Sequence, residues 1–321
     1  MIVASKLKKK YGDFTAVDGI SFTVKQGEIF GFLGPNGAGK TSTINMMIGL
    51  SRPTEGEIII DGIDVRRQTK KAQAIMGIVP DVSNLYNEMT GFENLCFCAS
   101  LYGLPKKERE HKARQLLERF QLTGIEERPF KAYSKGMRRK LTIAAAIIHS
   151  PRVLFLDEPT AGIDIVSARQ VRELVLGLKE LGTTIFVTTH NIEEAERICD
   201  RLAFIANGKI VADGSVKELM DQVSHRQAMQ VVTDANVGGL IGGLQARFEG
   251  SIIEQIDDRS MLLKSRNQIP LLPLVEYLSR HGISVYEAKY VRPSLEDVFI
   301  SLTGSEKPLI SRNKGKGGQK P

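Results

Sequence analysis

The chain has 321 residues, of which 42% are hydrophobic and 25% are charged, a composition typical of a folded globular protein of about two domains. Its formal net charge of +7 is uneven, because residues 305–321 carry five basic residues and one acidic residue and leave only +3 for the rest. The most apolar stretch, residues 141–148, is far shorter than the roughly 20 residues that a membrane span needs, so the chain is predicted to have no transmembrane segment of its own.

The cysteines and the chain ends give no sign of secretion. Cys96, Cys98 and Cys199 are odd in number, and the first two would diverge on a helix, so we expect reduced thiols in a cytoplasmic protein rather than disulfides or a zinc site. No signal peptide precedes the first expected strand. Residues 305–321 have glycines among their lysines and are predicted to form a disordered basic tail. We favour a solvated terminus over contact with anionic lipid or RNA.

The N-terminal residues predict two antiparallel strands. Residues 2–7 and 16–24 are expected to form them, joined by a turn at Tyr11-Gly12-Asp13. The ring of Tyr11 could stack on an adenine base, and an ordinary turn tyrosine is the alternative.

A phosphate-binding loop of the form G-x-x-x-x-G-K-[ST] follows, between an expected strand at 28–33 and an expected helix at 42–48. In such a loop, backbone N–H groups approach the phosphates, Lys40 reaches the β- and γ-phosphates, and the Thr41 hydroxyl binds Mg²⁺. The N-terminus of the following helix also favours an anion. The predicted nucleotide-binding residues are therefore Gly34, Pro35, Asn36, Gly37, Ala38, Gly39, Lys40, Thr41 and Ser42.

The middle of the chain predicts a helical subdomain at about residues 82–150. An apolar strand at 75–80, ended by Asp81, precedes helical patterns whose apolar residues recur at three- and four-residue spacing. A further helix is expected at 138–148. Before it, Ser134, Lys135 and Gly136 form a second possible anion site, although a serine at that place is usually only a helix cap.

Two carboxylates and a histidine end the next two expected strands. The apolar residues 153–156 lead to Asp157 and Glu158, at the strand end where ligands bind in open α/β sheets. Asp157 would hold Mg²⁺ through water and Glu158 would polarise the attacking water, and an acidic turn is the alternative. The strand at 183–189 ends in His190, which could bond the γ-phosphate or be structural.

A change of composition near Ser215 marks a small C-terminal α+β domain with no chemical motif of its own. Glycines make residues 238–243 an expected loose region. Strands are expected near 230–232, 252–256, 261–263 and 283–290, and a helix is expected at 274–280.

The order of these motifs resembles an ATP-binding cassette, the nucleotide-binding subunit of ABC transporters, over about residues 2–215. The resemblance implies an α/β fold: a P-loop NTPase ABC cassette with a RecA-like core, an antiparallel β subdomain and a helical subdomain. The remainder of the chain, ending in residues 293–304, resembles the C-terminal extension of the drug-resistance (daunorubicin-exporter-like) subfamily, whose subunits work with a separately encoded membrane permease. The predicted domains are therefore an ATPase domain at 1–215, an accessory α+β domain at 216–304, and the tail at 305–321.

The resemblance also implies a mechanism that uses ATP and Mg²⁺. Two cassettes, expected to be identical, would close head to tail, so that Ser134, Lys135 and Gly136 meet the γ-phosphate held by Lys40 of the partner subunit. Glu158 would be the catalytic base and His190 the γ-phosphate sensor. Asp164, from the loop 161–164, would link the two sites. Closure would switch the permease, and hydrolysis would reset it.

Three departures from the family pattern involve four positions. Asp81 stands where a glutamine is usual and would still offer an oxygen toward Mg²⁺-bound water. Lys135 and Met137 alter the usual Leu-Ser-Gly-Gly-Gln signature, where Lys135 adds positive charge near the phosphate. Lys140 replaces an arginine, which is not equivalent in hydrogen bonding.

Three functions are weighed. The favoured one is a transport ATPase, peripheral at the cytoplasmic face of the membrane and exporting its cargo, with no specific nucleic-acid partner. The alternative is a non-transport ABC ATPase acting on nucleic acid or the ribosome. Chromosome-type members of the family need a long coiled coil between the phosphate-binding loop and the signature, and about 90 residues here leave no room for one. The third is a nucleotide-dependent regulator without efficient hydrolysis.

Overall fold

The computed structural model describes residues 1–221, 227–265, 267–291 and 295–303. The predicted tail at 305–321 lies outside the described residues, as do Pro293 and Ser294 of the C-terminal extension. Cα proximity divides the chain into two compact units between Val216 and Lys217. Each unit is described by itself below.

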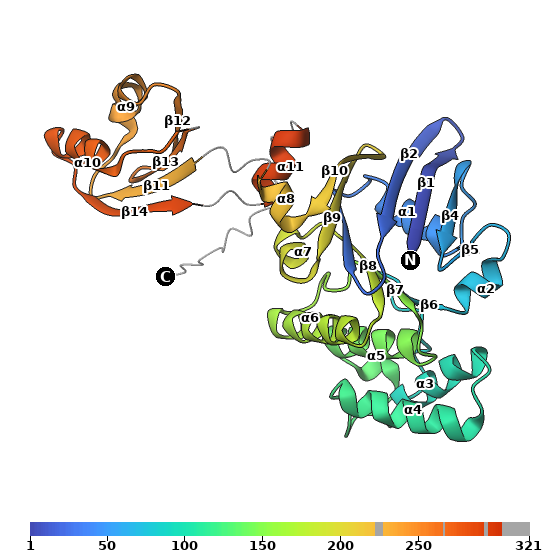
Figure 1. The fold of residues 1–321 in the computed structure, drawn as a ribbon. Helices are drawn as coiled ribbons and strands as arrows, with labels where there is room; N and C mark the ends of the chain where they lie inside the picture. The colour runs from blue at the N-terminus through green and yellow to red at the C-terminus, as the bar shows by residue number, and fades with distance from the viewer. Residues whose placement is uncertain (222–226, 266, 292–294, 304–321) are drawn as a thin grey trace. The chain divides into compact units, whose positions relative to one another are not determined.

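The first unit begins with an antiparallel sheet of strand order β2-β1-β4-β5 (Figure 1). Ile2 is paired with Val24 on one side and with Ile60 on the other, which places apolar side chains of three strands on one face. Its strands are β1 (Ile2–Tyr11), β2 (Phe14–Val24), β4 (Glu55–Ile60) and β5 (Ile63–Asp64). The expected pair of N-terminal strands is therefore present.

A second sheet of six strands, in the order β10-β9-β3-β8-β7-β6, carries the expected apolar strands of the core. Strands β6, β7, β8, β3 and β9 run parallel, and β10 returns antiparallel in a hairpin with β9. The bounds are β3 (Ile29–Leu33), β6 (Met76–Val79), β7 (Val153–Asp157), β8 (Thr184–Thr189), β9 (Arg201–Ala206) and β10 (Lys209–Ser215). The carboxyl ends of β3, β7 and β8 lie side by side, so the residues that follow them meet at one edge.

The core between these two sheets is aromatic. The ring of Phe22 from β2 lies 5.5–5.8 Å from the rings of Phe30, Phe32 and Phe186 in the other sheet. Phe155 extends the cluster through Phe186, at 5.8 Å. Offset and tilted rings at such distances add to the hydrophobic free energy of burial. The cluster thus holds β3, β7 and β8, and the loops that follow them, on a rigid base.

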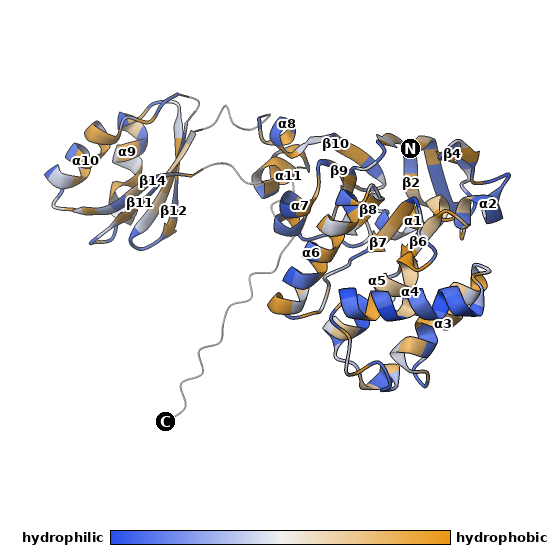
Figure 2. Ribbon diagram, turned by 60° about the horizontal axis from the view of Figure 1, so that its bottom comes forward, coloured by the Kyte–Doolittle hydropathy of each residue, from blue (hydrophilic) through white to orange (hydrophobic). Residues whose placement is uncertain are grey.

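Seven α-helices of the first unit precede its final hairpin in the described chain: α1 (Lys40–Met47), α2 (Thr69–Gln73), α3 (Gly91–Leu101), α4 (Lys106–Arg119), α5 (Lys135–Ile147), α6 (Ile165–Glu180) and α7 (Ile192–Ile198), with a 3-10 turn η1 (Phe130–Ala132). Helices α3 and α4 form a pair beside α5 (Figure 1). The outer surface of α4 is strongly hydrophilic, and only Ala113 and Leu117 of this helix are buried (Figure 2).

Two helices begin earlier than the sequence predicts. Helix α1 starts at Lys40 rather than at residue 42, directly after Gly39, whose left-handed φ of 109° ends the loop. Helix α5 starts at Lys135 rather than at residue 138, because the Ser134 hydroxyl accepts a hydrogen bond from the Met137 N–H and caps the helix. Lys135 and Gly136 therefore lie inside the first turn of α5.

His149, just after α5, joins the helical subdomain to the parallel sheet. Its ring stacks on Tyr102 with centroids 3.5 Å apart, and its Nε2 lies 2.9 Å from the Met76 carbonyl oxygen. Burial, with Lys112 nearby, lowers the pKa of His149 to about 4. The folded chain therefore holds a neutral imidazole that donates from Nε2 to the carbonyl.

We expect this histidine to make the fold acid-sensitive between pH 6.5 and about 4. In that range His149 is protonated in the unfolded chain but stays neutral in the folded chain. The free energy of unfolding therefore falls as the pH falls. With partial exposure discounted, the loss is about 1–2 kcal/mol. In His149→Gln, whose amide can still donate to Met76, the melting temperature should fall less from pH 7 to pH 4.5 than in the wild type. Equal losses in both proteins would contradict this account.

The second unit contains an antiparallel sheet of order β12-β13-β11-β14, as the α+β expectation requires. Its buried side chains include Val231, Leu263 and Leu274. The strands are β11 (Gln227–Thr233), β12 (Ser251–Asp257), β13 (Ser260–Ser265) and β14 (Val285–Val291), and the helices are α9 (Ile241–Arg247) and α10 (Leu271–Arg280), with a 3-10 turn η2 (Gly238–Leu240). Two further helices are α8 (Val216–Asp221) and α11 (Leu295–Thr303).

The expected loose region at 238–243 is wrong. It is occupied by η2 and the start of α9, because Leu244 is fully buried in the core and holds the helix in place. Glycine at 243 lets the Tyr277 hydroxyl approach α9 closely, since a Cβ there would lie 2.1 Å from it. Tertiary packing here overrides the low helix propensity of glycine.

Candidate nucleotide site

The predicted phosphate-binding loop lies between β3 and α1 and folds around the ammonium group of Lys40. Lys40 is 6% exposed, and its Nζ donates to the carbonyl oxygens of Gly34 at 2.7 Å and Pro35 at 3.3 Å. Gly34 cannot be larger, because a Cβ there would lie 2.2 Å from the Ile205 carbonyl oxygen. With Gly37 and Gly39 at positive φ, the loop can turn its N–H groups toward an anion.

A cavity of about 390 Å³ opens beside this loop. It brings together residues from four separate parts of the sequence: Phe14, Ala16, Pro35, Asn36, Gly37, Gly39, Lys40, Thr41, Ser42, Asp81, Asp157 and Glu158. Ten of these residues, all except Phe14 and Ala16, were predicted from the sequence, and the cavity has the size of a small-ligand site.

Glu158 occupies the centre of a hydrogen-bonded group. Its carboxylate lies 2.8 Å from Nδ1 of His190 and 3.4 Å from Nζ of Lys40, and its side chain is 14% exposed. Its backbone is left-handed, with φ of 47°, and its N–H donates to the Thr188 carbonyl at 3.0 Å. A non-glycine residue in this region costs about 1–2 kcal/mol, which the surrounding hydrogen bonds offset. Glu158, the predicted catalytic base, and His190, the predicted γ-phosphate sensor, are thus within hydrogen-bond distance of each other.

The donors around Thr41 fit a magnesium ion. The Thr41 hydroxyl and the carboxylates of Asp157 and Asp81 line the same cavity, and hard oxygen donors are those that Mg²⁺ prefers. Burial raises the pKa of Asp157, although the Thr188 hydroxyl donates to its carboxylate. Within the described ranges, no group of three His, Cys, Asp or Glu residues could hold a metal alone. Such an ion therefore needs further oxygen ligands from phosphate and water.

Asp81 is also close to a residue that the sequence interpretation did not single out. Oδ1 of Asp81 lies 3.8 Å from Nη2 of Arg139 on α5, and the Asp81 side chain is 58% exposed. Arg139 itself is buried. The only sequence feature that could have identified Arg139 is its position five residues after Ser134, on the helix that follows the second predicted anion site.

Tyr11, the residue predicted to stack on the adenine base, lies on the first hairpin outside the cavity. Tyr11 does not line the cavity; it is 50% exposed, with Nζ of Lys9 5.0 Å from the ring centroid. Phe14, paired with Tyr11 across the hairpin, lines the cavity and is 63% exposed. Phe14 was missed because no motif marks it. The stacking role of Tyr11 stays a prediction, with Phe14 as a second aromatic ring at hand.

The second predicted anion site lies at the N-termini of α5 and α6. Asp164 caps α6 by accepting from the N–H and the hydroxyl of Ser167, at 2.9 and 2.7 Å, and these hydrogen bonds lower the pKa of Asp164. Gly136 packs against the same serine, because a Cβ at 136 would lie 2.1 Å from its hydroxyl. None of Ser134, Lys135, Gly136 and Asp164 lines the cavity of the phosphate-binding loop. One chain thus keeps the two half-sites apart.

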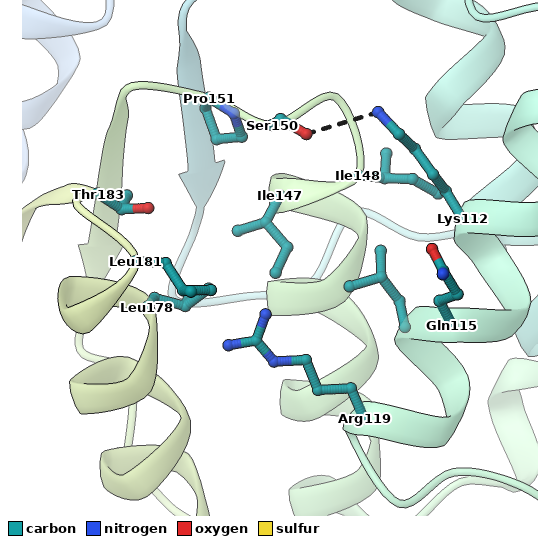
Figure 3. A pocket seen from close by; sticks show the side chains of 11 residues that line it. Lys112, Gln115, Arg119, Ile147, Ile148, Ser150, Pro151, Leu178, Leu181 and Thr183 are labelled. Atoms are coloured by element: carbon teal, nitrogen blue, oxygen red, sulfur yellow. Dashed lines mark hydrogen bonds between the residues drawn. The ribbon is translucent and has the colours of Figure 1, made fainter.

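A larger cavity, of about 520 Å³, lies between α4, α5 and α6 (Figure 3). Ile147 and Leu178 give it apolar walls, Arg119 extends from α4 toward α6, and Lys112 points to the Ser150 hydroxyl. None of the predicted nucleotide-binding or catalytic residues lines this cavity, so we do not assign it to ATP binding or hydrolysis.

The fold and this site define a P-loop ATPase of the ATP-binding-cassette class. Residues 17–161 match the family described as "ABC transporter". The chain is 35% identical over 306 residues to a linearmycin resistance ATP-binding protein of Bacillus subtilis (strain 168), covering 95% of this chain and 98% of the relative. It is 34% identical over 308 residues to a daunorubicin resistance ATP-binding protein of Streptomyces coeruleorubidus, covering 95% and 96%. The chain therefore belongs to the ATP-binding proteins of ABC transporters.

Solved structures agree with this assignment. An ATP-binding subunit of an ABC transporter superposes with a TM-score of 0.64 at 31% identity, covering 69% of this chain and 92% of that one. A dimeric ATP-binding cassette in a post-hydrolysis state, bound to ADP and Pi, gives a TM-score of 0.62 at 26% identity, covering 67% and 98%. The predicted fold class and ATPase activity are confirmed by these comparisons.

Proposed function

We propose that this chain is the ATP-hydrolysing subunit of an exporter and works as a head-to-tail pair with a second, identical copy. The single observation that carries the proposal is the separation of the two half-sites in one chain: the loop cavity holds Lys40 and Glu158, while Ser134 and Gly136 lie outside it. A second copy can supply the missing half. The proposed ATPase domain spans residues 1–215, with its helical subdomain at about 82–150, and the proposed accessory domain spans 216–304.

In the proposed reaction, the residues around Glu158 change partners when ATP binds. The γ-phosphate competes for Lys40 with the Glu158 carboxylate, which lies 3.4 Å from the Lys40 Nζ. The released Glu158 carboxylate accepts a proton from the attacking water. His190, whose Nδ1 lies 2.8 Å from that carboxylate, orients it relative to the γ-phosphate. Mg²⁺, held by Thr41 and Asp157, with Asp81 toward its bound water, would neutralise phosphate charge.

The surface around the second half-site supports the proposed pairing. Ile165 and Val166, at the start of α6 next to Asp164, are 86% and 67% exposed. Large apolar side chains this exposed are suited to burial against a partner. They lie on the helix start that Asp164 caps, where the nucleotide of a second copy would arrive.

A membrane permease is the second proposed partner. No helix in the described part of the chain is long and apolar enough to cross a membrane. Val82 and Tyr86, in the loop after β6, and Leu101, at the end of α3, are 79%, 55% and 70% exposed and offer an apolar surface to such a partner. The drug-resistance relatives, and a Nod factor export ATP-binding protein of Ralstonia nicotianae at 36% identity, favour export. We place the chain at the cytoplasmic face of the membrane.

Mixing two inactive variants tests the head-to-tail arrangement. Lys40→Ala damages the phosphate-binding loop and leaves the Ser134–Gly136 half-site intact, and Gly136→Ala does the reverse, since its Cβ displaces Ser167. In a mixed dimer one composite site is complete, so an equal mixture should recover roughly a quarter of wild-type ATP hydrolysis. No recovery, with mixed dimers detected by differential tagging, would contradict the head-to-tail arrangement.

A further inference from the structure

Arg139 is a buried arginine that ties together two loops of the nucleotide site. It lies on α5 and is 7% exposed. Nη1 donates to the Pro80 carbonyl at 2.7 Å, and Nη2 donates to the carbonyls of Asp81 at 2.8 Å and Glu158 at 3.3 Å. Three backbone carbonyls on one guanidinium form a rigid contact, because the planar fork fixes the directions of its donors.

The two loops that Arg139 contacts follow neighbouring strands. Residues Pro80 and Asp81 come directly after β6, Glu158 comes directly after β7, and Val79 is paired with Leu156. The sheet therefore aligns these loops, and Arg139 fixes their ends to α5. Ser134, which caps α5, lies five residues before Arg139, or about 7.5 Å along the helix axis. A shift at the cap is thus carried rigidly to Arg139.

The contact with Glu158 matters because its backbone is strained. Its left-handed φ of 47° persists only if neighbouring groups hold it, and the Arg139 donor to its carbonyl is one of them. Arg139 also places a positive charge beside Asp81, at 3.8 Å. Loss of this arginine would remove one of the hydrogen bonds that hold the strained backbone of Glu158.

We infer that Arg139 is a positioning residue that connects the Ser134 end of α5 to the catalytic carboxylate of the same chain. This inference rests on the proposed function, in which Ser134 of one subunit meets the nucleotide held by the other. Engagement of that nucleotide is transmitted through α5 and Arg139 to Glu158, which belongs to the opposite composite site. The two ATP sites are in this way linked through each chain as well as across the interface.

The test compares Arg139→Lys and Arg139→Gln with the control Arg201→Lys. Arg201 also donates to a backbone carbonyl, that of Thr23, and pairs with Glu28 and Asp213, but none of these partners lines the nucleotide cavity, whereas Asp81 and Glu158 do. Steady-state ATP hydrolysis gives kcat, KM and the Hill coefficient, and thermal melting reports the fold. We expect Arg139→Gln to lower kcat at least about tenfold with KM changed less than about threefold, because the loss lies in positioning rather than in binding.

The Hill coefficient separates this role from a merely structural one. Arg139→Lys should keep the charge and the fold, hydrolyse more slowly than Arg201→Lys, and show a Hill coefficient nearer to 1 than the wild type. If Arg139→Gln fails to fold, Arg139→Lys alone decides. Wild-type kcat and cooperativity in Arg139→Lys, or a rise in KM with kcat unchanged, would overturn the inference. Failure of the proposed function would differ, since the wild type itself would then lack hydrolysis that depends on Glu158.

Discussion

Glu158→Gln is expected to lower kcat for ATP hydrolysis by at least about 100-fold, the range that general-base catalysis contributes. The glutamine amide is nearly isosteric with the carboxylate, so the fold and the contact with His190 can persist while the proton acceptor is lost. ATP should still bind, and more tightly, because Lys40 no longer has to break its ion pair with the Glu158 carboxylate, at 3.4 Å, before it contacts the phosphates.

Two measurements on purified Glu158→Gln check this expectation. Phosphate release gives kcat, and size-exclusion chromatography with light scattering detects a dimer when ATP is present. Glu173→Gln serves as a matched control, since this exposed glutamate of α6 pairs only with Arg169 among the described residues. Hydrolysis within a factor of about three of the wild type would show that another group accepts the proton.

Lys40→Ala is expected to weaken ATP binding by at least about 100-fold. The variant loses charge-assisted hydrogen bonds to the phosphates, and leaves the carbonyls of Gly34 and Pro35 without their buried donor. The loop should therefore lose both its charge and part of its shape.

Titration with a fluorescent ATP analogue measures this loss. Lys107→Ala, an exposed lysine of α4, is the matched control and should bind as the wild type does. Since Lys40 also neutralises Glu158, the melting temperature of Lys40→Ala should fall in the nucleotide-free state and should not rise on addition of ATP. Unchanged affinity in Lys40→Ala would contradict the assignment of the loop.

Local motifs predicted the parts of the site that adjoin in sequence. The glycines and the lysine of residues 34–41 form a local motif whose backbone conformation binds phosphate. The apolar strands that Glu158 and His190 follow are of the kind buried in a parallel sheet. For this reason the loop and the strands agree with expectation, whereas the hydrogen bond between Glu158 and His190 was not predicted and follows from the pairing of β7 with β8. The family resemblance supplied the order of subdomains, which no local pattern contains.

The features that were missed depend on contacts between distant residues. Phe14 reaches the cavity through the hairpin geometry, and Arg139 acquires its role only when α5 packs beside the ends of β6 and β7. For neither Phe14 nor Arg139 does the residue type alone indicate a functional role. The helix at Ile241–Arg247 was missed for the same reason, since the burial of Leu244 outweighs two glycines. Sequence reasoning thus finds catalytic groups more readily than the residues that hold them in place.

The most direct test of the central claim is the rate of ATP hydrolysis as a function of protein concentration, measured for the wild type beside Glu158→Gln. The account predicts that the wild-type rate rises more steeply than linearly, because each complete site needs two chains, and that Glu158→Gln stays inactive at every concentration. A rate that is linear in concentration and indifferent to Glu158 would contradict both the paired sites and the role of the carboxylate.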